Sequence, residues 1–168
     1  HFCIVTDILI QAGVSTQAPG LSYNPCFPTA RAWFTMPQAS SPIGVFDSGV
    51  GGLSVLRALL AALPHERFVY LADSANAPYG ERGDAFVAAR THAITQYLRE
   101  QHDIKALVVA CNTATAAAIH EVRSSHPDLL LVGLEPAIKS ALAVTKTGHV
   151  GVIGTRGTLT SAKFGKLM

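Results

Sequence analysis

From Ser41 onward the chain alternates short, uninterrupted apolar runs with amphipathic stretches, and this alternation limits the possible folds more than any other feature. The continuous apolar runs are typical of strands that are covered on both faces. The amphipathic stretches between them are typical of helices with one buried side. The predicted strands are 43–46, 68–71, 106–110, 129–132 and 150–153, and the predicted helices are 53–63, 84–98, 114–122 and 136–144.

Strands that alternate with helices predict an α/β fold, in which helices flank a parallel sheet. Right-handed crossovers place all the strand-to-helix turns along one edge of such a sheet, and that edge is where open α/β folds bind ligands. Three of these turns carry polar groups, and we expect them to form a site: Asp47-Ser48, Tyr79-Gly80 and Cys111-Asn112-Thr113.

Cys111 is the most informative of these residues, because it ends a buried strand and begins a helix. Free N–H groups and the positive end of the helix dipole favour a thiolate there, which can act as a base or a nucleophile. The alternative is a buried cysteine that only fills space. Asn112 and Thr113 add an amide, a hydroxyl and backbone N–H groups, which suit a carboxylate ligand.

The other polar residues have structural interpretations as well. Asp47 or Ser48 can cap the helix that follows, Asp84 can cap the next one, and Tyr79 can belong to a rigid surface turn. The glycines at 49–52 fit neither a dinucleotide fingerprint, which needs glycine at position 54, nor a P-loop. The seven histidines show no zinc spacing, so no metal is expected. The helical arginines Arg57, Arg90, Arg99 and Arg123 are interpreted as surface charges.

Charge and cysteine content limit the class of partner. Lys and Arg number 13 and Asp and Glu 11, which gives a net charge of +2 and no field suited to nucleic acid. Three cysteines are too few for a disulfide framework, so a reducing compartment, the cytoplasm, is expected. The apolar run 2–10 is interrupted by Thr6 and Asp7, so no membrane span is expected.

The organisation along the chain suggests three parts. Residues 1–40 show no sustained periodicity and are interpreted as a disordered extension, with Met36 as a hypothetical native start. Residues 41–134 are interpreted as a first α/β domain. The segment 150–157 echoes 43–50, so 135–168 is interpreted as the beginning of a second α/β domain. Chance similarity is the alternative, because such turns are common at strand ends.

Three motifs together resemble the glutamate racemases of the aspartate/glutamate racemase family. They are GVFDSGVGGL at 44–53, PYG at 78–80 and ACNTA at 110–114, in matching order and spacing. The resemblance covers about Ser41 to the end and implies two pseudo-symmetric α/β domains with the active site between them. It also implies inversion at Cα without a cofactor, by two cysteines on opposite faces of the substrate, to supply D-glutamate for peptidoglycan.

Carried over by position, the resemblance makes Cys111 one of the two cysteines and Asp47 the carboxylate that assists proton transfer. Glutamate is the implied small-molecule partner, and a homodimer is an assembly that the resemblance allows. The implied substrate-binding residues are Ser48, Tyr79, Gly80, Asn112, Thr113, Thr155 and Thr158.

The sequence departs from the family in one respect. The second catalytic cysteine, expected in a Gly-Cys-Thr-His turn, is absent from the 168 residues, and the spacing of the two halves would place it after Met168. Cys3 and Cys26 lie in no strand-turn-helix context. The alternatives therefore are an aspartate racemase, a related cysteine-dependent decarboxylase or isomerase, and a non-catalytic fragment that only binds an acidic amino acid.

Overall fold

A computed structural model describes residues 38–168 and contains a four-stranded parallel sheet with the strand order β2-β1-β3-β4. The register pairs Ile43 with both Phe68 and Ala106, so the strands begin level and their carboxyl ends share one edge. The predicted fold class, a parallel sheet flanked by helices, is therefore confirmed. The strands are β1 (Ile43–Asp47), β2 (Phe68–Ala72), β3 (Ala106–Val109) and β4 (Leu130–Gly133).

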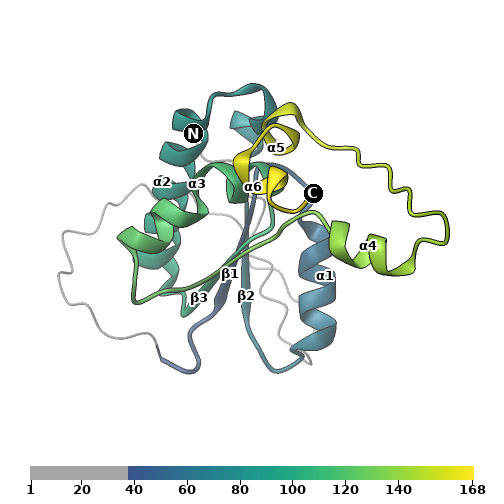
Figure 1. Cartoon of the computed structure of the whole chain (residues 1–168). Helices are drawn as coiled ribbons and strands as arrows, with labels where there is room; N and C mark the ends of the chain where they lie inside the picture. The colour runs from purple at the N-terminus through teal and green to yellow at the C-terminus, as the bar shows by residue number, and fades with distance from the viewer. Residues whose placement is uncertain (1–37) are drawn as a thin grey trace.

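Helices cover both faces of the sheet (Figure 1). α1 lies on one face, while α2 and α3 pack together on the other. The helices are α1 (Leu53–Ala62), α2 (Asp84–His102), α3 (Asn112–Ser125), α4 (Ile138–Val144), α5 (Arg156–Leu159) and α6 (Ala162–Gly165), with single 3₁₀ turns η1 (Ser74–Asn76) and η2 (Tyr79–Glu81).

The two-residue period of a strand explains how the sheet has two buried faces. Val45 and Val108 belong to the apolar cluster beneath α1, together with Tyr70. Their neighbours Phe46 and Val109 belong to the cluster beneath α2 and α3, which also holds the predicted apolar face of α2. Because both sides of β1, β2 and β3 are covered, these strands are mainly apolar up to the carboxyl end, where β1 closes with Asp47, and this is the pattern that predicted them.

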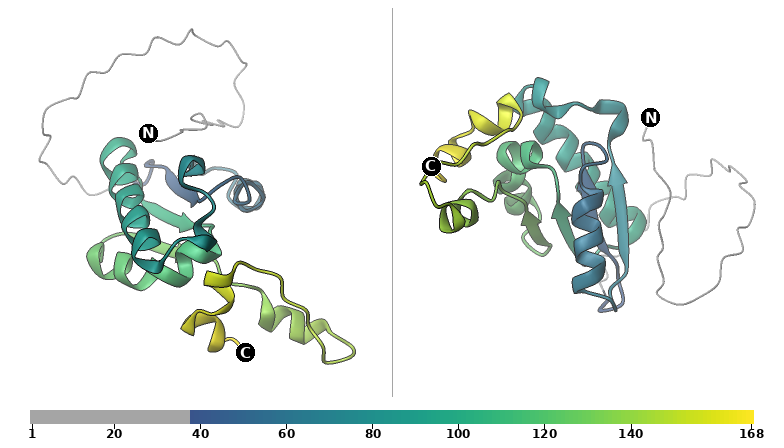
Figure 2. Two further views of the ribbon diagram at one scale, coloured as in Figure 1. Left: turned by 90° about the horizontal axis from the view of Figure 1, so that it is seen from above. Right: turned by 90° about the vertical axis from the view of Figure 1, so that its right-hand side faces the viewer.

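The edge strand β4 is covered on one face only. Leu131 is 6% exposed against α3, whereas Leu130 and Val132, which point the other way, are 67% and 47% exposed. Beyond β4 the chain extends away from the sheet through α4 and a long loop, and returns at α5 beside the start of α3 (Figures 1 and 2).

Two sequence predictions are wrong at the level of elements. Residues 150–153 form no strand, and Ile153 is fully exposed, because within residues 38–168 no neighbouring strand pairs with this segment. Asp84 does not cap α2: Gly83 is the N-cap residue and Asp84 is the first helical residue. There its charge still lies in the first turn, where carboxylates are favoured.

Two further predictions stay untested. The interpretation of residues 1–40 as a disordered extension, and of Met36 as the native start of the protein, falls largely on residues 1–37, which lie outside the described residues. The division into a first domain at 41–134 and the start of a second at 135–168 stays a prediction. In the part of the chain that the structure covers, no helix is long and apolar enough to cross a membrane.

Candidate active site

The loops that follow β1, β2 and β3 meet at the carboxyl edge of the sheet, as the sequence predicted. Parallel strands in level register bring residues 47–52, 73–81 and 111–113 to the same edge. Each loop carries polar side chains that the sequence singled out. The site is therefore a product of the sheet topology, because the three loops are far apart in the chain.

Cys111 is the N-cap residue of α3, in an extended backbone conformation. Its Sγ accepts a hydrogen bond from the backbone N–H of Ala114 at 3.5 Å and donates one to Ser48 Oγ at 3.4 Å. The residue is 6% exposed and lines a cavity. A sulfur atom at a helix N-terminus, with a hydroxyl partner and an opening to a cavity, has the surroundings of a reactive cysteine.

Asp47 lies beside this cysteine at the end of β1 and lines the same cavity. Its Oδ2 accepts a hydrogen bond from the backbone N–H of Gly52 at 2.8 Å, and the residue is 7% exposed. Gly52 is the N-cap residue of α1, so the carboxylate also holds the start of that helix. Ser48 does not cap α1, because its hydroxyl contacts Cys111 instead.

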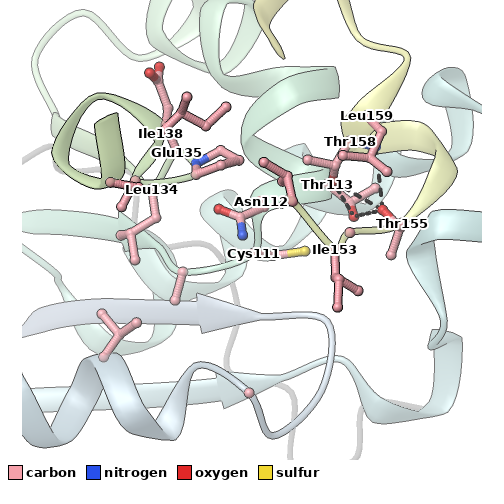
Figure 3. A pocket seen from close by; sticks show the side chains of 18 of the residues that line it. Cys111, Asn112, Thr113, Leu134, Glu135, Ile138, Ile153, Thr155, Thr158 and Leu159 are labelled. Atoms are coloured by element: carbon pink, nitrogen blue, oxygen red, sulfur yellow. Dashed lines mark hydrogen bonds between the residues drawn. The ribbon is translucent and has the colours of Figure 1, made fainter. Parts of the chain in front are cut away.

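Three threonine hydroxyls form a closed ring on the other side of Cys111 (Figure 3). Thr113 Oγ1 lies 3.0 Å from Thr155 Oγ1 and 3.3 Å from Thr158 Oγ1, and the last two are 3.0 Å apart. Thr113 and Thr158 are buried, while Thr155 is exposed. The structure thus brings together the predicted hydroxyls of residues that lie more than forty positions apart in the chain.

Gly80 lies directly against this ring. A Cβ atom at position 80 would stand 2.4 Å from the Cβ of Thr155 and 2.6 Å from its Cγ2, distances that real side chains do not reach. Only glycine allows the η2 turn to approach α5 so closely. Gly80 does not line the cavity itself, but it supports a residue that does.

Tyr79 does not point into the cavity. Its side chain is 1% exposed, and its hydroxyl donates to Asp73 Oδ2 at 2.6 Å. The interpretation of Tyr79 as a surface turn is therefore wrong, because the phenol turns inward to meet a buried carboxylate. Burial raises the pKa of Tyr79, and the Asp73 charge raises it further.

Arg90 is not a free surface charge, which corrects a second interpretation. Its guanidinium binds Asp73 through Nε at 2.9 Å and through its terminal nitrogen at 2.8 Å. Burial works to raise the pKa of Asp73, but hydrogen bonds from Arg90, Tyr79 and Asn76 outweigh it and lower the pKa below its ordinary value. This network fixes the loop that carries Gly80.

The cavity has a volume of about 680 Å³. Its polar wall is formed by Asp47, Asn112, Thr113, Thr155 and Thr158, and the mainly apolar segments 134–138 and 150–154 line the rest. In Figure 3, Leu134, Glu135 and Ile138 lie on one side of Cys111, and Ile153 lies on the other side, next to Thr155. Of the nine predicted site residues, Asp47, Cys111, Asn112, Thr113, Thr155 and Thr158 line it, whereas Ser48, Tyr79 and Gly80 stand behind them. The apolar residues Leu134, Ile138 and Ile153 carried no signal in the sequence that would assign them to a site.

Tyr70 does not line the cavity, but it contacts the turn that carries Ser48, and the predictions from sequence did not assign it to the site. It is 3% exposed in β2, and its hydroxyl donates to the carbonyl oxygen of Gly49 at 3.0 Å. Burial raises the pKa of Tyr70, and the charges of Asp47 and Cys111 raise it further. A usable signal did exist, because a tyrosine near the carboxyl end of a buried strand needs a partner for its hydroxyl.

Metal binding is not supported by the geometry of the side chains. Across residues 38–168 the structure shows no group of three or more His, Cys, Asp or Glu residues that could hold a metal ion.

Comparisons with known proteins identify the family to which the chain is similar. A family model described as Asp/Glu/hydantoin racemase matches residues 43–167. The chain is 54% identical over 133 residues to the glutamate racemase of Ectopseudomonas mendocina (strain ymp), and these residues cover 79% of the chain and 50% of that protein. It is 53% identical over 133 residues to the glutamate racemase of Pseudomonas aeruginosa (strain UCBPP-PA14), with the same coverage.

The solved structures that resemble this chain include glutamate racemases as well. The crystal structure of Escherichia coli glutamate racemase in complex with L-glutamate and the activator UDP-MurNAc-ala matches with a TM-score of 0.71 and 39% identity, over 76% of this chain and 48% of that one. The Thermus thermophilus glutamate racemase in complex with β-chloro-D-alanine matches with a TM-score of 0.66 and 43% identity, over 76% and 48%. The chain thus spans about half the length of the relatives that it matches.

Proposed function

Because this chain belongs to the Asp/Glu/hydantoin racemase family, we propose that it contributes to the racemisation of glutamate, with Cys111 as the residue that moves the α-proton. The observation that carries the proposal is the position of the Cys111 sulfur. It lies at the N-terminus of α3, within contact of Ser48 and beside Asp47, at the polar wall of a cavity.

The proposed step is a proton transfer at Cα. The Cys111 thiolate takes the α-proton and becomes a thiol, and the electron pair of the C–H bond stays on Cα. An α-proton is very weakly acidic, so hydrogen bonds to the substrate carboxylate must stabilise the charge that develops. The amide of Asn112 and the hydroxyls of Thr113, Thr155 and Thr158 are the donors that this wall of the cavity offers.

Inversion also needs an acid on the opposite face of the substrate, which gives a proton to Cα there. In the family this is a second cysteine, in a Gly-Cys-Thr-His turn that the 168 residues do not contain. Complete racemisation is thus proposed for the whole protein, while the residues of this chain form one face of the site. Proton exchange at Cα is the part of the reaction that Cys111 can perform on its own.

Glutamate is the proposed substrate, in preference to aspartate. The relatives at about half identity are named glutamate racemases, and the solved relative from Escherichia coli holds L-glutamate. No cofactor is proposed, since a thiolate with a polarised carboxylate suffices for this proton transfer.

The proposed role in the cell is the supply of D-glutamate for peptidoglycan in the cytoplasm. It rests on the family resemblance and on the small number of cysteines. A homodimer stays a prediction.

The test follows the fate of the α-hydrogen and of the stereocentre together. We expect the protein to exchange the α-hydrogen of L-glutamate in D₂O, as seen by mass spectrometry, and Cys111→Ala to lower this rate at least about a hundredfold, because it removes the base. Formation of D-glutamate is measured in the same samples by chiral chromatography. L-Aspartate, offered in parallel, tests the choice of substrate.

The matched control is Cys26→Ala, which removes a thiol outside the described residues and should leave exchange unchanged. The proposed function would be contradicted if the unaltered protein showed no more exchange and no more inversion than Cys111→Ala. Faster exchange with aspartate than with glutamate would overturn the choice of substrate.

A further inference from the structure

We propose that Tyr70 is a positioning residue: its hydroxyl fixes the turn 47–52 so that Ser48 faces the sulfur of Cys111. The proposal rests on the proposed function for its catalytic meaning, since it concerns the residue that moves the proton. Its structural content is a chain of contacts from β2, through a backbone carbonyl, to the hydroxyl that meets Cys111.

The first contact lies between Tyr70 and the turn. Tyr70 stands among apolar side chains beneath α1 and is 3% exposed. Its hydroxyl donates a hydrogen bond of 3.0 Å to the carbonyl oxygen of Gly49, and Gly49 is the residue directly after Ser48. A buried hydroxyl that left this bond would lose its partner, which costs free energy, so the turn is held in the place where the bond forms.

A second contact places the same hydroxyl beneath the other end of the turn. A Cβ atom at Gly52 would lie 3.0 Å from the Tyr70 oxygen and 2.8 Å from the Cβ of Asp47. The turn therefore packs onto the phenol at a distance that only glycine permits. Asp47 holds the turn from its other side, through the backbone N–H of Gly52 at 2.8 Å.

The turn 47–52 is held by Tyr70 and by Asp47, and it presents the side chain of Ser48 to the sulfur of Cys111. Ser48 lies between Asp47 and Gly49, and its Oγ is the acceptor 3.4 Å from Cys111 Sγ. A sulfur–oxygen contact at this distance is lost with a small movement of the backbone. A tyrosine phenol is protonated at neutral pH and so acts as a donor, and burial and the nearby charges move the pKa of Tyr70 further up from its ordinary value.

Tyr70→Phe removes the hydroxyl and keeps the ring, which makes it a suitable test. The rate at which iodoacetamide alkylates Cys111 is measured by peptide mass spectrometry, which separates Cys111 from Cys3 and Cys26. The rate is compared in the unaltered protein, Tyr70→Phe, Ser48→Ala and the double variant. We expect each single variant to change the rate in the same direction, about threefold or more, and Tyr70→Phe to have little further effect once Ser48→Ala is present.

Effects that multiply in the double variant, or a Tyr70→Phe rate equal to that of the unaltered protein, would overturn the proposal. Tyr97→Phe on α2 is the matched control, because it makes the same chemical change away from the turn. A thermal melt of each variant verifies folding, and hydrogen exchange should quicken in the peptide 47–52 but not in β2. If the backbone amides of Tyr70→Phe exchanged faster throughout the protein, Tyr70 would have a general structural role, and this would contradict the proposal.

The alkylation rates need no substrate, so they test Tyr70 whether or not glutamate is turned over. When turnover is measured, Tyr70→Phe should lower kcat for α-proton exchange and leave KM for glutamate unchanged, because Ser48 acts on the base. A raised KM with unchanged kcat would argue against positioning of Cys111. If the unaltered protein does not exchange the α-hydrogen of glutamate, the proposed function is contradicted, and the alkylation rates alone then decide whether Tyr70 positions Ser48.

Discussion

At the scale of single residues, a buried charge with four hydrogen bonds, that of Asp73, lies outside the cavity. Asp73 is 1% exposed and receives hydrogen bonds from Tyr79 at 2.6 Å, from Asn76 at 2.9 Å and twice from Arg90. A buried carboxylate with this many donors is stabilised in its charged form. Removal of Arg90 takes away the only cation of this network and leaves the buried charge with the two neutral donors Tyr79 and Asn76, so Arg90 is the partner whose loss costs the most.

Arg90→Gln tests this network. We expect it to lower the free energy of unfolding by about 3 kcal/mol at neutral pH, because it takes the cation from a buried carboxylate. The pKa of Asp73 is lowered in the folded protein, so its stabilising effect is present above the unfolded pKa of about 4. It is lost as the pH falls through the folded-state pKa, and the two proteins should then become similar in stability.

The measurement is urea unfolding of both proteins across the acid range. Arg57→Gln is the control, since Arg57 is exposed on α1. An equal loss for both variants, or a gap that does not shrink in acid, would contradict the role of Arg90.

At the scale of elements, the sequence predicted the parts that obey local rules. The strand runs at 43–46, 68–71, 106–110 and 129–132 are each within about two residues of the structure, because burial on both faces leaves a continuous apolar run. Cys111 was placed correctly at a strand-to-helix junction for the same reason. α3 begins at Asn112, two residues before the predicted start.

The failures at this scale come from contacts between distant segments. Nothing in the local sequence shows that 150–153 lacks a partner strand, or that Tyr79 turns inward to meet Asp73 and Arg90. Tyr70 lies within an apolar run, and the partner of its hydroxyl, the carbonyl oxygen of Gly49, belongs to a turn 21 residues earlier in the chain. Such residues depend on how loops fold back on one another, and their spacing in the chain does not record this.

Gly80→Ala tests the packing of η2 against α5. We expect a loss of about 1–3 kcal/mol in the free energy of unfolding, because the new methyl group would overlap Thr155. Gly151→Ala is the matched control, since a Cβ there meets nothing within 4 Å and Gly151 lies outside the helices. Chemical denaturation of the two variants gives the comparison, and similar stabilities would show that the turn and α5 are not packed as the structure has them.

At the scale of the whole molecule, the sheet has a fully covered centre and a half-covered edge. The cluster beneath α2 and α3 extends from β2 to β4, whereas the cluster beneath α1 ends at β3. Two leucines on the adjacent strands β3 and β4 therefore experience different surroundings, because they point to opposite faces of the sheet. Leu107 is fully buried, and Leu130 is 67% exposed.

Leu107→Ala and Leu130→Ala make the same chemical change at these two places. We expect Leu107→Ala to lower the free energy of unfolding by about 2–5 kcal/mol, because it opens a cavity in a packed core. Leu130→Ala should change it by no more than about 0.5 kcal/mol. Thermal and urea unfolding measure both, and a large loss at Leu130 would mean that this face of β4 is covered in solution.

The ring of Thr113, Thr155 and Thr158 also joins the sheet framework to the returning end of the chain. Three hydroxyls carry three hydrogens for three contacts, so the donors can follow one another around the ring in either sense. An arriving carboxylate would take one hydrogen from the ring and leave two contacts in place. The three threonines can thus donate a hydrogen bond to a ligand and still hold the segment 155–158 against α3.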